Sequence, residues 1–300
     1  MEELEQVKHQ IREYLVQISD QKSMELFDLL PSGKMLRSKL ILKIAGVTQE
    51  SIQLCAVVEM IHAASLLHDD VIDEADTRRG QKTINNLFDN KTSIMFGDIL
   101  YSKAFTELTT MDKEIAYTIS NAVTLLSVGE LLDVELSKSF NTSYDTYFDM
   151  IYKKTASLIE ASAKSAAILA SKDKESFALY GKNLGLAFQM IDDILDITEE
   201  SSTLGKPAML DFVEGKVTIP YLLTYEKLDA ISKQKLIKFY KKQLDSTELS
   251  WIKEKMVETN AIDESILLAK KFGFEAIEAI RQEKNEDLIL IMRSMIERDF

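Results

Sequence analysis

Cysteine, proline and glycine are all scarce in this chain of 300 residues. It has one cysteine, Cys55, three prolines and ten glycines. A single cysteine excludes an intramolecular disulfide and fits a reducing compartment. So few helix-breaking residues over this length favour long helices and little sheet.

Positive charge is also in deficit, with a net charge of −13 and an isoelectric point near 4.9. Such a chain lacks the basic surface that neutralises nucleic-acid phosphates, and its docking to an anionic membrane is disfavoured. The start, MEELEQVKHQ, lacks the basic segment and apolar core of a signal peptide. No run approaches the roughly 18 apolar residues of a membrane span. We therefore predict a cytoplasmic protein with no transmembrane segment and no nucleic-acid partner.

What the chain does have is helical periodicity in a globular composition, 46% hydrophobic and 28% charged. No strand-like alternation of five or more residues and no glycine- or serine-rich linker is evident. The sequence predicts an all-α fold with one domain over residues 1–300. The helical patterns cover residues 1–30, 36–46, 50–74, 92–110, 112–138, 144–170, 174–199 and 216–229.

An acidic motif occurs twice in apolar helical sequence, as LLHDDVID at 66–73 and QMIDDILD at 189–196. Residues four apart share a helix face, so each motif pairs its first and last aspartates. If the two helices face each other, these carboxylates converge as an oxygen-only ligand set that suits Mg²⁺ and phosphates. One such motif is as readily an exposed helix end, whereas two in buried sequence favour a metal site. The six aspartates are Asp69, Asp70, Asp73, Asp192, Asp193 and Asp196.

Basic residues lie beside these motifs and beside breaks in the helical pattern. Arginine binds phosphate through a bidentate fork and lysine as a point charge. Each alone is more often a surface residue, but together they indicate phosphate binding. A Walker loop is excluded, because Gly33-Lys34 is followed by Met35, and no GxGxxG is present. The candidates are Lys34, Arg37, Arg78, Arg79, Lys153, Lys154, Lys206 and Lys216.

In the order and spacing of its motifs the chain resembles the trans-isoprenyl diphosphate synthases, from about residue 30 to 222. Met35 and Ser38 depart from the family pattern, which usually has a basic residue and a proline there. The resemblance implies a helical bundle around a central cavity, the isoprenoid synthase fold, usually as a homodimer that uses Mg²⁺. The motifs are GKMLR at 33–37, HAASLLHDDVIDEADTRRG at 62–80, KKTA at 153–156, FQMIDDILD at 188–196 and GKPAMLDFVEGKVTIP at 205–220.

The resemblance also implies a role for each matching residue. The implied Mg²⁺ ligands are Asp69, Asp73 and Asp192, supported by Asp70, Asp193 and Asp196. The implied allylic diphosphate site is Arg78, Lys154 and Lys206. The implied isopentenyl diphosphate site is Lys34, Arg37, His62 and Arg79, although His62 alone would more often be a core histidine. Thr155 and Gln189 are implied to supply oxygen dipoles for the allylic cation, and both are implied to contact substrate. Lys216 is a further implied substrate contact.

Product length depends on the residues one turn deeper than Asp69, which are Ala64 and Ser65. In short-chain members of the family these positions tend to be large aromatics that close the cavity. Each further helical turn adds about 5 Å of depth, comparable to one isoprene unit. The alternative is that these residues are small only to let helices pack closely. We predict a long product, octaprenyl, within a range of hexaprenyl to decaprenyl.

The predicted enzyme condenses farnesyl or geranylgeranyl diphosphate with successive isopentenyl diphosphates by ionisation, condensation and elimination. Three alternatives remain. A terpene cyclase is disfavoured because its second motif usually differs from DDxxD. A shorter-chain geranylgeranyl diphosphate synthase would share every motif. A non-catalytic, prenyl-binding subunit of a heteromeric synthase would typically lose part of one acidic motif.

Overall fold

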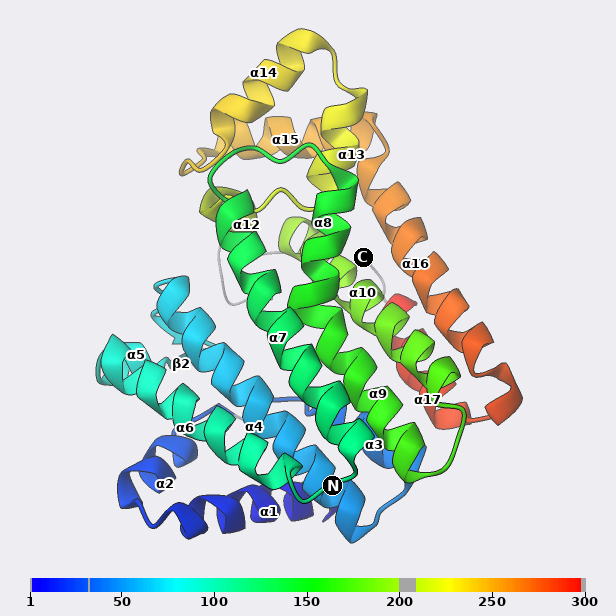
Figure 1. Cartoon of the computed structure of the whole chain (residues 1–300). Coiled ribbons are helices and arrows are strands. Elements are labelled where there is room, and N and C mark those ends of the chain that lie inside the picture. Colours follow the sequence, from blue (N-terminus) through cyan, green and yellow to red (C-terminus); the bar gives the residue numbers. More distant parts are fainter. Residues whose placement is uncertain (1, 32, 200–208, 298–300) are drawn as a thin grey trace. The chain divides into compact units, whose positions relative to one another are not determined.

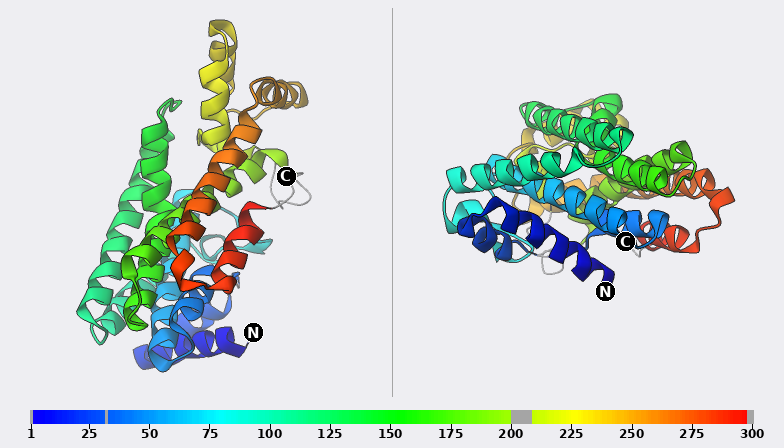
Figure 2. Two further views of the ribbon diagram at one scale, coloured as in Figure 1. Left: turned by 90° about the vertical axis from the view of Figure 1, so that its right-hand side faces the viewer. Right: turned by 60° about the horizontal axis from the view of Figure 1, so that its bottom comes forward.

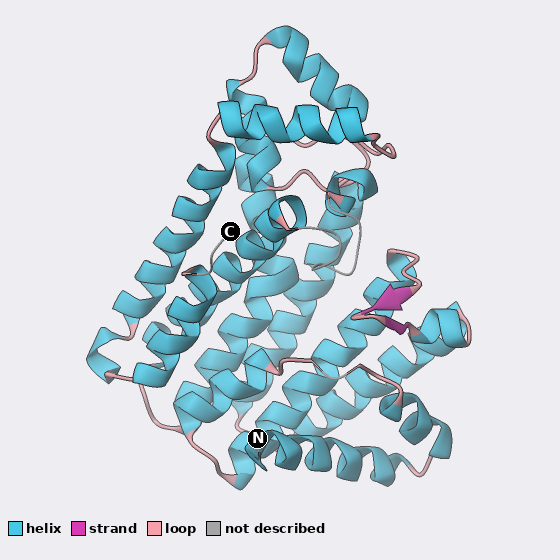
Figure 3. Ribbon diagram, turned by 180° about the vertical axis from the view of Figure 1, so that it is seen from behind, coloured by secondary structure: helices cyan, strands magenta, loops and turns pink. Residues whose placement is uncertain are grey.

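The chain folds almost wholly into helices in the computed structural model, which describes residues 2–31, 33–199 and 209–297. The strands among these residues are β1 (Thr77–Arg78) and β2 (Gln81–Lys82), paired as an antiparallel hairpin (Figure 3). Strands of two residues are too short to show an alternating pattern in the sequence. The predicted all-α class is confirmed.

The residues group into two compact units, each of which is described by itself. Unit 1 comprises Met1–Val123 and Glu160–Ala178, and unit 2 comprises Thr124–Ile159 and Leu179–Phe300. A single domain over residues 1–300 stays a prediction. The boundaries between the units fall within three helices, α7 (Lys113–Leu136), α9 (Ser157–Leu169) and α10 (Lys174–Thr198).

Unit 1 is organised around α4 (Gln49–Ile72), an apolar helix that is buried over most of its length. Thr48 begins α4 with a capping box, in which Thr48 and Ser51 each accept a hydrogen bond from the backbone N–H of the other. The helices that pack against α4 are α1 (Glu2–Ile18), α3 (Leu36–Ala45), α5 (Ile84–Leu87) and α6 (Asn90–Leu108) (Figure 1).

The periodic pattern of residues 1–30 belongs to two helices, α1 and α2 (Gln21–Asp28). Ser19 has a φ of 59°, and this left-handed conformation ends α1. Asp20 then caps α2, because its side chain accepts a hydrogen bond of 2.8 Å from the backbone N–H of Ser23. The turn is therefore made by serine and aspartate, without glycine or proline.

Unit 2 has a core in which Phe212 of α12 (Leu210–Glu214) stacks on Tyr221 of α13 (Ile219–Lys227), with ring centroids 4.3 Å apart. Near the C-terminus, α16 (Ala261–Ala279) packs against α13, α15 (Ser246–Glu258) and α17 (Glu286–Ile296) (Figure 2). The other elements are α8 (Tyr144–Ile151), the π-helix η1 (Tyr152–Ala156), α14 (Ala230–Phe239) and the 3₁₀ turn η2 (Arg281–Glu283).

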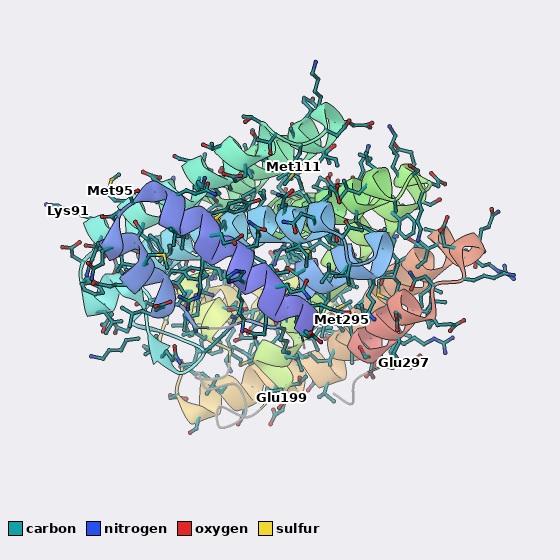
Figure 4. The ribbon with its side chains drawn as sticks, turned by 90° about the horizontal axis from the view of Figure 1, so that it is seen from below. Lys91, Met95, Met111, Glu199, Met295 and Glu297 are labelled. Carbon is teal, nitrogen blue, oxygen red and sulfur yellow. The ribbon has the colours of Figure 1, made fainter. Side chains whose placement is uncertain are left out.

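Two helices, α4 and α7, are long and apolar enough to cross a membrane by length and composition alone. Core helices of globular proteins pass the same test, and 67% of the most apolar window of α4 is buried, against 39% for α7. The α7 helix instead exposes Val128, Leu131 and Val134 at intervals of three residues. Met95 of α6 also lies at the surface (Figure 4). The absence of a transmembrane segment stays a prediction.

Candidate active site

The first acidic motif lies at the C-terminal end of α4, where its three aspartates differ in exposure. Asp69 is half-buried, Asp70 is buried, and Asp73, the C-terminal cap, is exposed. Arg78 donates a hydrogen bond of 2.7 Å from Nε to Asp70 Oδ1. Burial raises the pKa of Asp70, and the adjacent Arg78 guanidinium opposes that rise. Asp70 is thus bound to the protein, while Asp69 and Asp73 reach solvent.

The arginine pair of the first motif is placed by the β1–β2 hairpin. Thr77 pairs with Lys82 and Arg78 with Gln81, so Arg79 and Gly80 form a two-residue turn. Both have positive φ, 53° and 74°, as in the type I′ turns that suit the twist of a hairpin. The two adjacent arginines have different contacts, because Arg78 bonds to Asp70 and Arg79 lies against Gly33.

Arg79 lies against Gly33, which brings the first two motifs of the family together. A Cβ atom at position 33 would lie 2.6 Å from Arg79 Nη1, so the guanidinium occupies the space that a side chain would fill. Lys34 follows, exposed, and Met35 caps α3 with a φ of 48°. A larger residue than glycine at position 33 would displace Arg79.

His62 and three arginines form a cationic cluster in unit 1. Burial lowers the pKa of His62 well below its usual value, and the charges of Arg37, Arg79 and Arg78 lower it further. His62 is therefore neutral at pH 7. The structure brings together four of the residues predicted to bind diphosphate, from α3, α4 and the hairpin.

The departure from the family pattern at Ser38 has a structural reason. Its hydroxyl donates to Glu59 Oε1 at 2.7 Å, and its backbone N–H donates to the same oxygen at 3.3 Å. Proline offers neither donor. Glu59 lies on α4 one turn before His62, and its charge also acts on Arg37. Ser38 therefore links α3 to α4 beside the cationic cluster.

Both residues predicted to set chain length are buried in α4. Ala64 is fully buried, and Ser65 donates from its hydroxyl to the backbone carbonyl of His62 at 2.9 Å. The residues deeper along the helix, Val57, Met60 and Ile61, are also fully buried and apolar. Val57, Met60, Ile61 and Ala64 lie on one face of α4, and this face is apolar, as a prenyl tail requires.

The second acidic motif lies inside α10, which continues to Thr198. Asp192 is exposed, whereas Asp193 and Asp196 are buried. Asp193 accepts hydrogen bonds from Tyr147 and from Gln189, and burial raises its pKa well above the usual value. The Asp196 carboxylate accepts a hydrogen bond of 3.3 Å from the backbone N–H of Asp211 in α12, and its backbone carbonyl accepts one of 2.8 Å from Met209. Only the first carboxylate of this motif reaches solvent.

Lys154 of η1 is held between two carboxylates that the sequence analysis did not identify. Its Nζ lies 2.8 Å from Glu130 Oε2 and 2.6 Å from Asp133 Oδ2, both on α7. Gly129 permits this approach, since a Cβ there would lie 2.3 Å from the backbone nitrogen of Lys154. The signal in the sequence is GELLD at 129–133, two acids three residues apart in an apolar helix. The neighbouring Lys153 instead pairs with Asp149.

Thr155 and Gln189 are brought together by a second close approach of helices. Gly185, one turn before Gln189, lies so near Ala156 that a Cβ at position 185 would be 2.4 Å from Ala156 Cα. The Thr155 hydroxyl then donates to Gln189 Oε1 at 2.8 Å. A π-helix such as η1 is a feature frequently found at functional sites.

Lys216 and Lys206 are the two remaining lysines of the predicted site. Lys216 lines a small cavity in unit 2 with Asp133, Tyr147 and Thr218, and its Nζ lies 3.0 Å from Glu214 Oε2. The volume open to water in this cavity is about 20 Å³, enough for one water molecule. Lys206 lies outside the described residues.

The predicted site residues fall into two sets, one in each unit. Within residues 2–31, 33–199 and 209–297, no group of three or more His, Cys, Asp or Glu side chains is arranged to hold a metal ion. The solvent-facing carboxylates Asp69, Asp73 and Asp192 are all oxygen donors, and oxygen is the ligand type that Mg²⁺ prefers. The residues present therefore fit Mg²⁺ in chemistry, and their convergence on a shared ion is a proposal.

Comparison with known proteins gives matches along most of the chain. The polyprenyl synthetase family model matches residues 21–256. A prenyl transferase of Synechocystis sp. is 39% identical over 212 residues, which span 67% of this chain and 66% of that protein. The octaprenyl pyrophosphate synthase structure from Helicobacter pylori is 43% identical, with a TM-score of 0.94 and coverage of 99% of both chains.

A polyprenyl synthase from Caulobacter crescentus, crystallised in complex with calcium and isoprenyl diphosphate, is more distant, at 29% identity. Its TM-score is 0.87, and the match covers 99% of this chain and 94% of that one. The family predicted from the five motifs, the isoprenoid synthase fold and the class of enzyme, a prenyl-transferring synthase, are thus confirmed. With a family match over residues 21–256 and a structural match along nearly its whole length, this chain belongs to the polyprenyl synthetase family.

Proposed function

We propose that this enzyme extends an allylic diphosphate, farnesyl or geranylgeranyl, with successive isopentenyl diphosphates to an all-trans polyprenyl diphosphate, octaprenyl. The observation that carries the proposal is the pair of complete acidic motifs, each with its first aspartate facing solvent. The likeness to a structure described as an octaprenyl pyrophosphate synthase supports the length. We expect the purified chain to convert farnesyl and isopentenyl diphosphates to a C40 product with Mg²⁺. No polymer, or only C20, would contradict this.

Asp69, Asp73 and Asp192 are the residues that we propose hold Mg²⁺ against the allylic diphosphate. Their side chains reach solvent, whereas those of Asp70 and Asp193 are buried. Bound Mg²⁺ neutralises the charge that develops on a departing diphosphate and so lowers the barrier to ionisation. The calcium and isoprenyl diphosphate in the Caulobacter relative support a divalent cation here. Removal of metal with EDTA should abolish turnover, and Mg²⁺ should restore it.

The cationic side chains divide between the two substrates. In unit 1, Lys34, Arg37, Arg79 and neutral His62 offer donors that fit isopentenyl diphosphate. Lys154 fits the allylic diphosphate, together with Arg78 and Lys206. Arg37→Ala should therefore raise mainly the KM for isopentenyl diphosphate, and Lys154→Ala mainly the KM for the allylic substrate. Equal effects of both variants on both substrates would contradict this division.

Thr155 and Gln189 supply the oxygen dipoles that stabilise the allylic cation. Both are half-buried and hydrogen-bonded to each other. Attack by the double bond of isopentenyl diphosphate forms the new carbon–carbon bond and leaves a cation on the extended chain. Loss of a proton to the departed diphosphate regenerates a double bond. This route needs no histidine or glutamate base.

The growing tail is proposed to pass Ala64 and Ser65 toward Met60 and Val57, all of them buried. A graded series, Ala64→Val, Ala64→Leu and Ala64→Phe, should then shorten the product in steps, to about C15–C20 for phenylalanine, at about 5 Å of helix per turn. Chain-length analysis of the products is the measurement. An unchanged distribution in a folded, active Ala64→Phe variant would show that the tail runs elsewhere.

A homodimer is the proposed state, and α7 offers a surface for it. Its exposed Val128, Leu131 and Val134 form an apolar stripe of the sort that subunit contacts cover. Leu131→Glu should reduce the molar mass measured by light scattering to that of a monomer. Leu267→Glu changes a similarly exposed leucine on α16, and this matched control should leave the mass unchanged. The buried free thiol of Cys55 fits a cytoplasmic location.

A further inference from the structure

Tyr147 on α8 begins a chain of three hydrogen bonds, the first of them buried, that ends at Thr155. The Tyr147 hydroxyl donates to Asp193 Oδ2 at 2.5 Å. Gln189 Nε2 donates to the other oxygen, Asp193 Oδ1, at 3.0 Å. The Thr155 hydroxyl donates to Gln189 Oε1 at 2.8 Å. Three elements, α8, α10 and η1, are thereby joined by side chains alone.

The direction of each donor follows from the geometry of the network. Gln189 donates from Nε2 to Asp193 Oδ1, so its amide turns the carbonyl oxygen toward Thr155. The threonine hydroxyl has one proton, and Gln189 Oε1 receives it. Thr155 Oγ1 is then left with lone pairs only for any reacting centre beside it. Lone pairs stabilise a carbocation, whereas a reversed Gln189 amide would leave the threonine proton free to point at it.

Tyr147 is itself held at its hydroxyl and at its ring. The hydroxyl proton is donated to Asp193 Oδ2. The ring is 1% exposed and packs edge-on against Phe148, with centroids 5.3 Å apart. The hydroxyl cannot turn away without breaking a buried hydrogen bond, and such losses are costly. Asp193 Oδ2 is therefore held by a buried donor.

We infer that Tyr147 is a positioning residue of the condensation reaction: by holding Asp193 it sets the Gln189 amide and commits the Thr155 proton, so that only oxygen lone pairs face the allylic cation. This inference rests on the proposed function, because it needs a cationic intermediate beside Thr155. It also separates the roles within the second acidic motif. Asp192 faces solvent, and Asp193 uses both of its oxygens within the protein.

The test compares Tyr147→Phe with Tyr180→Phe. Tyr180 is also fully buried in unit 2 and also donates one hydrogen bond, to the Leu288 carbonyl at 2.7 Å, but nothing links it to the site. Both variants keep the ring and lose one buried hydroxyl, so their losses of thermal stability should be similar. Tyr147→Phe should lower kcat about tenfold, with the KM values of both substrates and the Mg²⁺ requirement unchanged. Tyr180→Phe should leave kcat as in the wild type.

Product length provides a second measurement. A network that acts only on the cation leaves the tunnel intact, so Tyr147→Phe should make the same product, more slowly. Asp193→Asn removes the same link from its other end and should give the same kinetic profile if Tyr147→Phe does not fold. Equal kcat values for Tyr147→Phe and Tyr180→Phe, or a fall in kcat matched by a change in KM, would overturn the inference. A wild-type chain without prenyl transfer would instead overturn the proposed function.

Discussion

The two acidic motifs have the same spacing but are held in opposite surroundings. In unit 1, Asp70 is neutralised by Arg78, and three arginines surround His62 nearby. In unit 2, Asp193 has tyrosine and glutamine as partners, and the charge of Asp211 acts on it. The second aspartate is balanced by a full positive charge in the first motif and by neutral donors in the second.

The comparison teaches that a repeated motif need not repeat its roles. The first motif ends its helix, which exposes Asp73, while the second lies within α10, which buries Asp196. What the two share is a first aspartate that reaches solvent and a second aspartate that is buried. A symmetric reading of DDxxD therefore holds for the exposure of the first two positions and fails for the third.

The largest expected effect concerns the first aspartate of each motif, which reaches solvent in both. Asp69→Ala and Asp192→Ala should each lower kcat by orders of magnitude, because each removes a proposed metal ligand. Circular dichroism and thermal melting should show that both variants keep their fold, since neither side chain is fully buried. Near-normal turnover in either variant would mean that the motifs do not share a metal site.

Arg78→Ala tests the difference between the second aspartates of the two motifs, because among the described residues only Asp70 is paired with a cation. It leaves the buried Asp70 carboxylate without its cation, and we expect a loss of about 2 kcal/mol of unfolding free energy. This is below the cost for a fully buried pair, because Arg78 is 30% exposed. Adding Asp70→Asn should recover part of the loss in denaturant titrations. A double variant less stable than Arg78→Ala would rule out the ion pair as the cause.

A smaller effect should follow from Gly185→Ala, which perturbs the contact that places Gln189. The new Cβ would lie 2.4 Å from a backbone atom of Ala156, so the helices must separate, at a cost of about 1–2 kcal/mol. Gly273→Ala on α16 is the matched control, because its Cβ would meet only side-chain atoms, those of Ile296 and Met292, and no backbone atom. Equal melting temperatures for the two variants would show that the α10–η1 contact can relax.

The smallest effect should be a difference in pH dependence. The pKa of His62 is lowered by burial and by the arginines, so stability is lost as pH falls below about 6.5, where only the unfolded chain takes up the proton. The pKa of Tyr221 is raised by burial and by Asp196, so stability is lost as pH rises above about 10. His62→Gln should flatten the acid slope of unfolding free energy, and Tyr221→Phe the alkaline slope. If these variants left the slopes of unfolding free energy against pH unchanged, the pKa shifts of His62 and Tyr221 would be contradicted.

Tyr221→Phe also has a simple expectation at neutral pH. The Tyr221 hydroxyl is buried without a hydrogen-bond partner in the described part of the chain, so its removal should be neutral or stabilising. Tyr147→Phe, which loses its bond to Asp193, should destabilise by about 1 kcal/mol. Denaturant titration of the two variants separates a bonded tyrosine from an unbonded one in the same unit.

Local signals in the sequence were enough for the helices and for the acidic motifs, because both depend on spacing along the chain. The partners of these motifs depend on approach between distant segments. Glu130 and Asp133 meet Lys154 only because Gly129 lets η1 come close, and Tyr147 reaches Asp193 across 46 residues of sequence. The Arg79-Gly80 turn likewise shows no typical Asn-Gly signal.

The central claim is that the exposed aspartates bind the metal and the buried ones do not. Its most direct test is the Mg²⁺ concentration for half-maximal turnover in Asp192→Asn and Asp193→Asn, adjacent and isosteric changes. We expect it to rise about tenfold or more in Asp192→Asn and to stay within about twofold of the wild type in Asp193→Asn, whose kcat should fall instead. An equal or larger rise in Asp193→Asn would contradict the account.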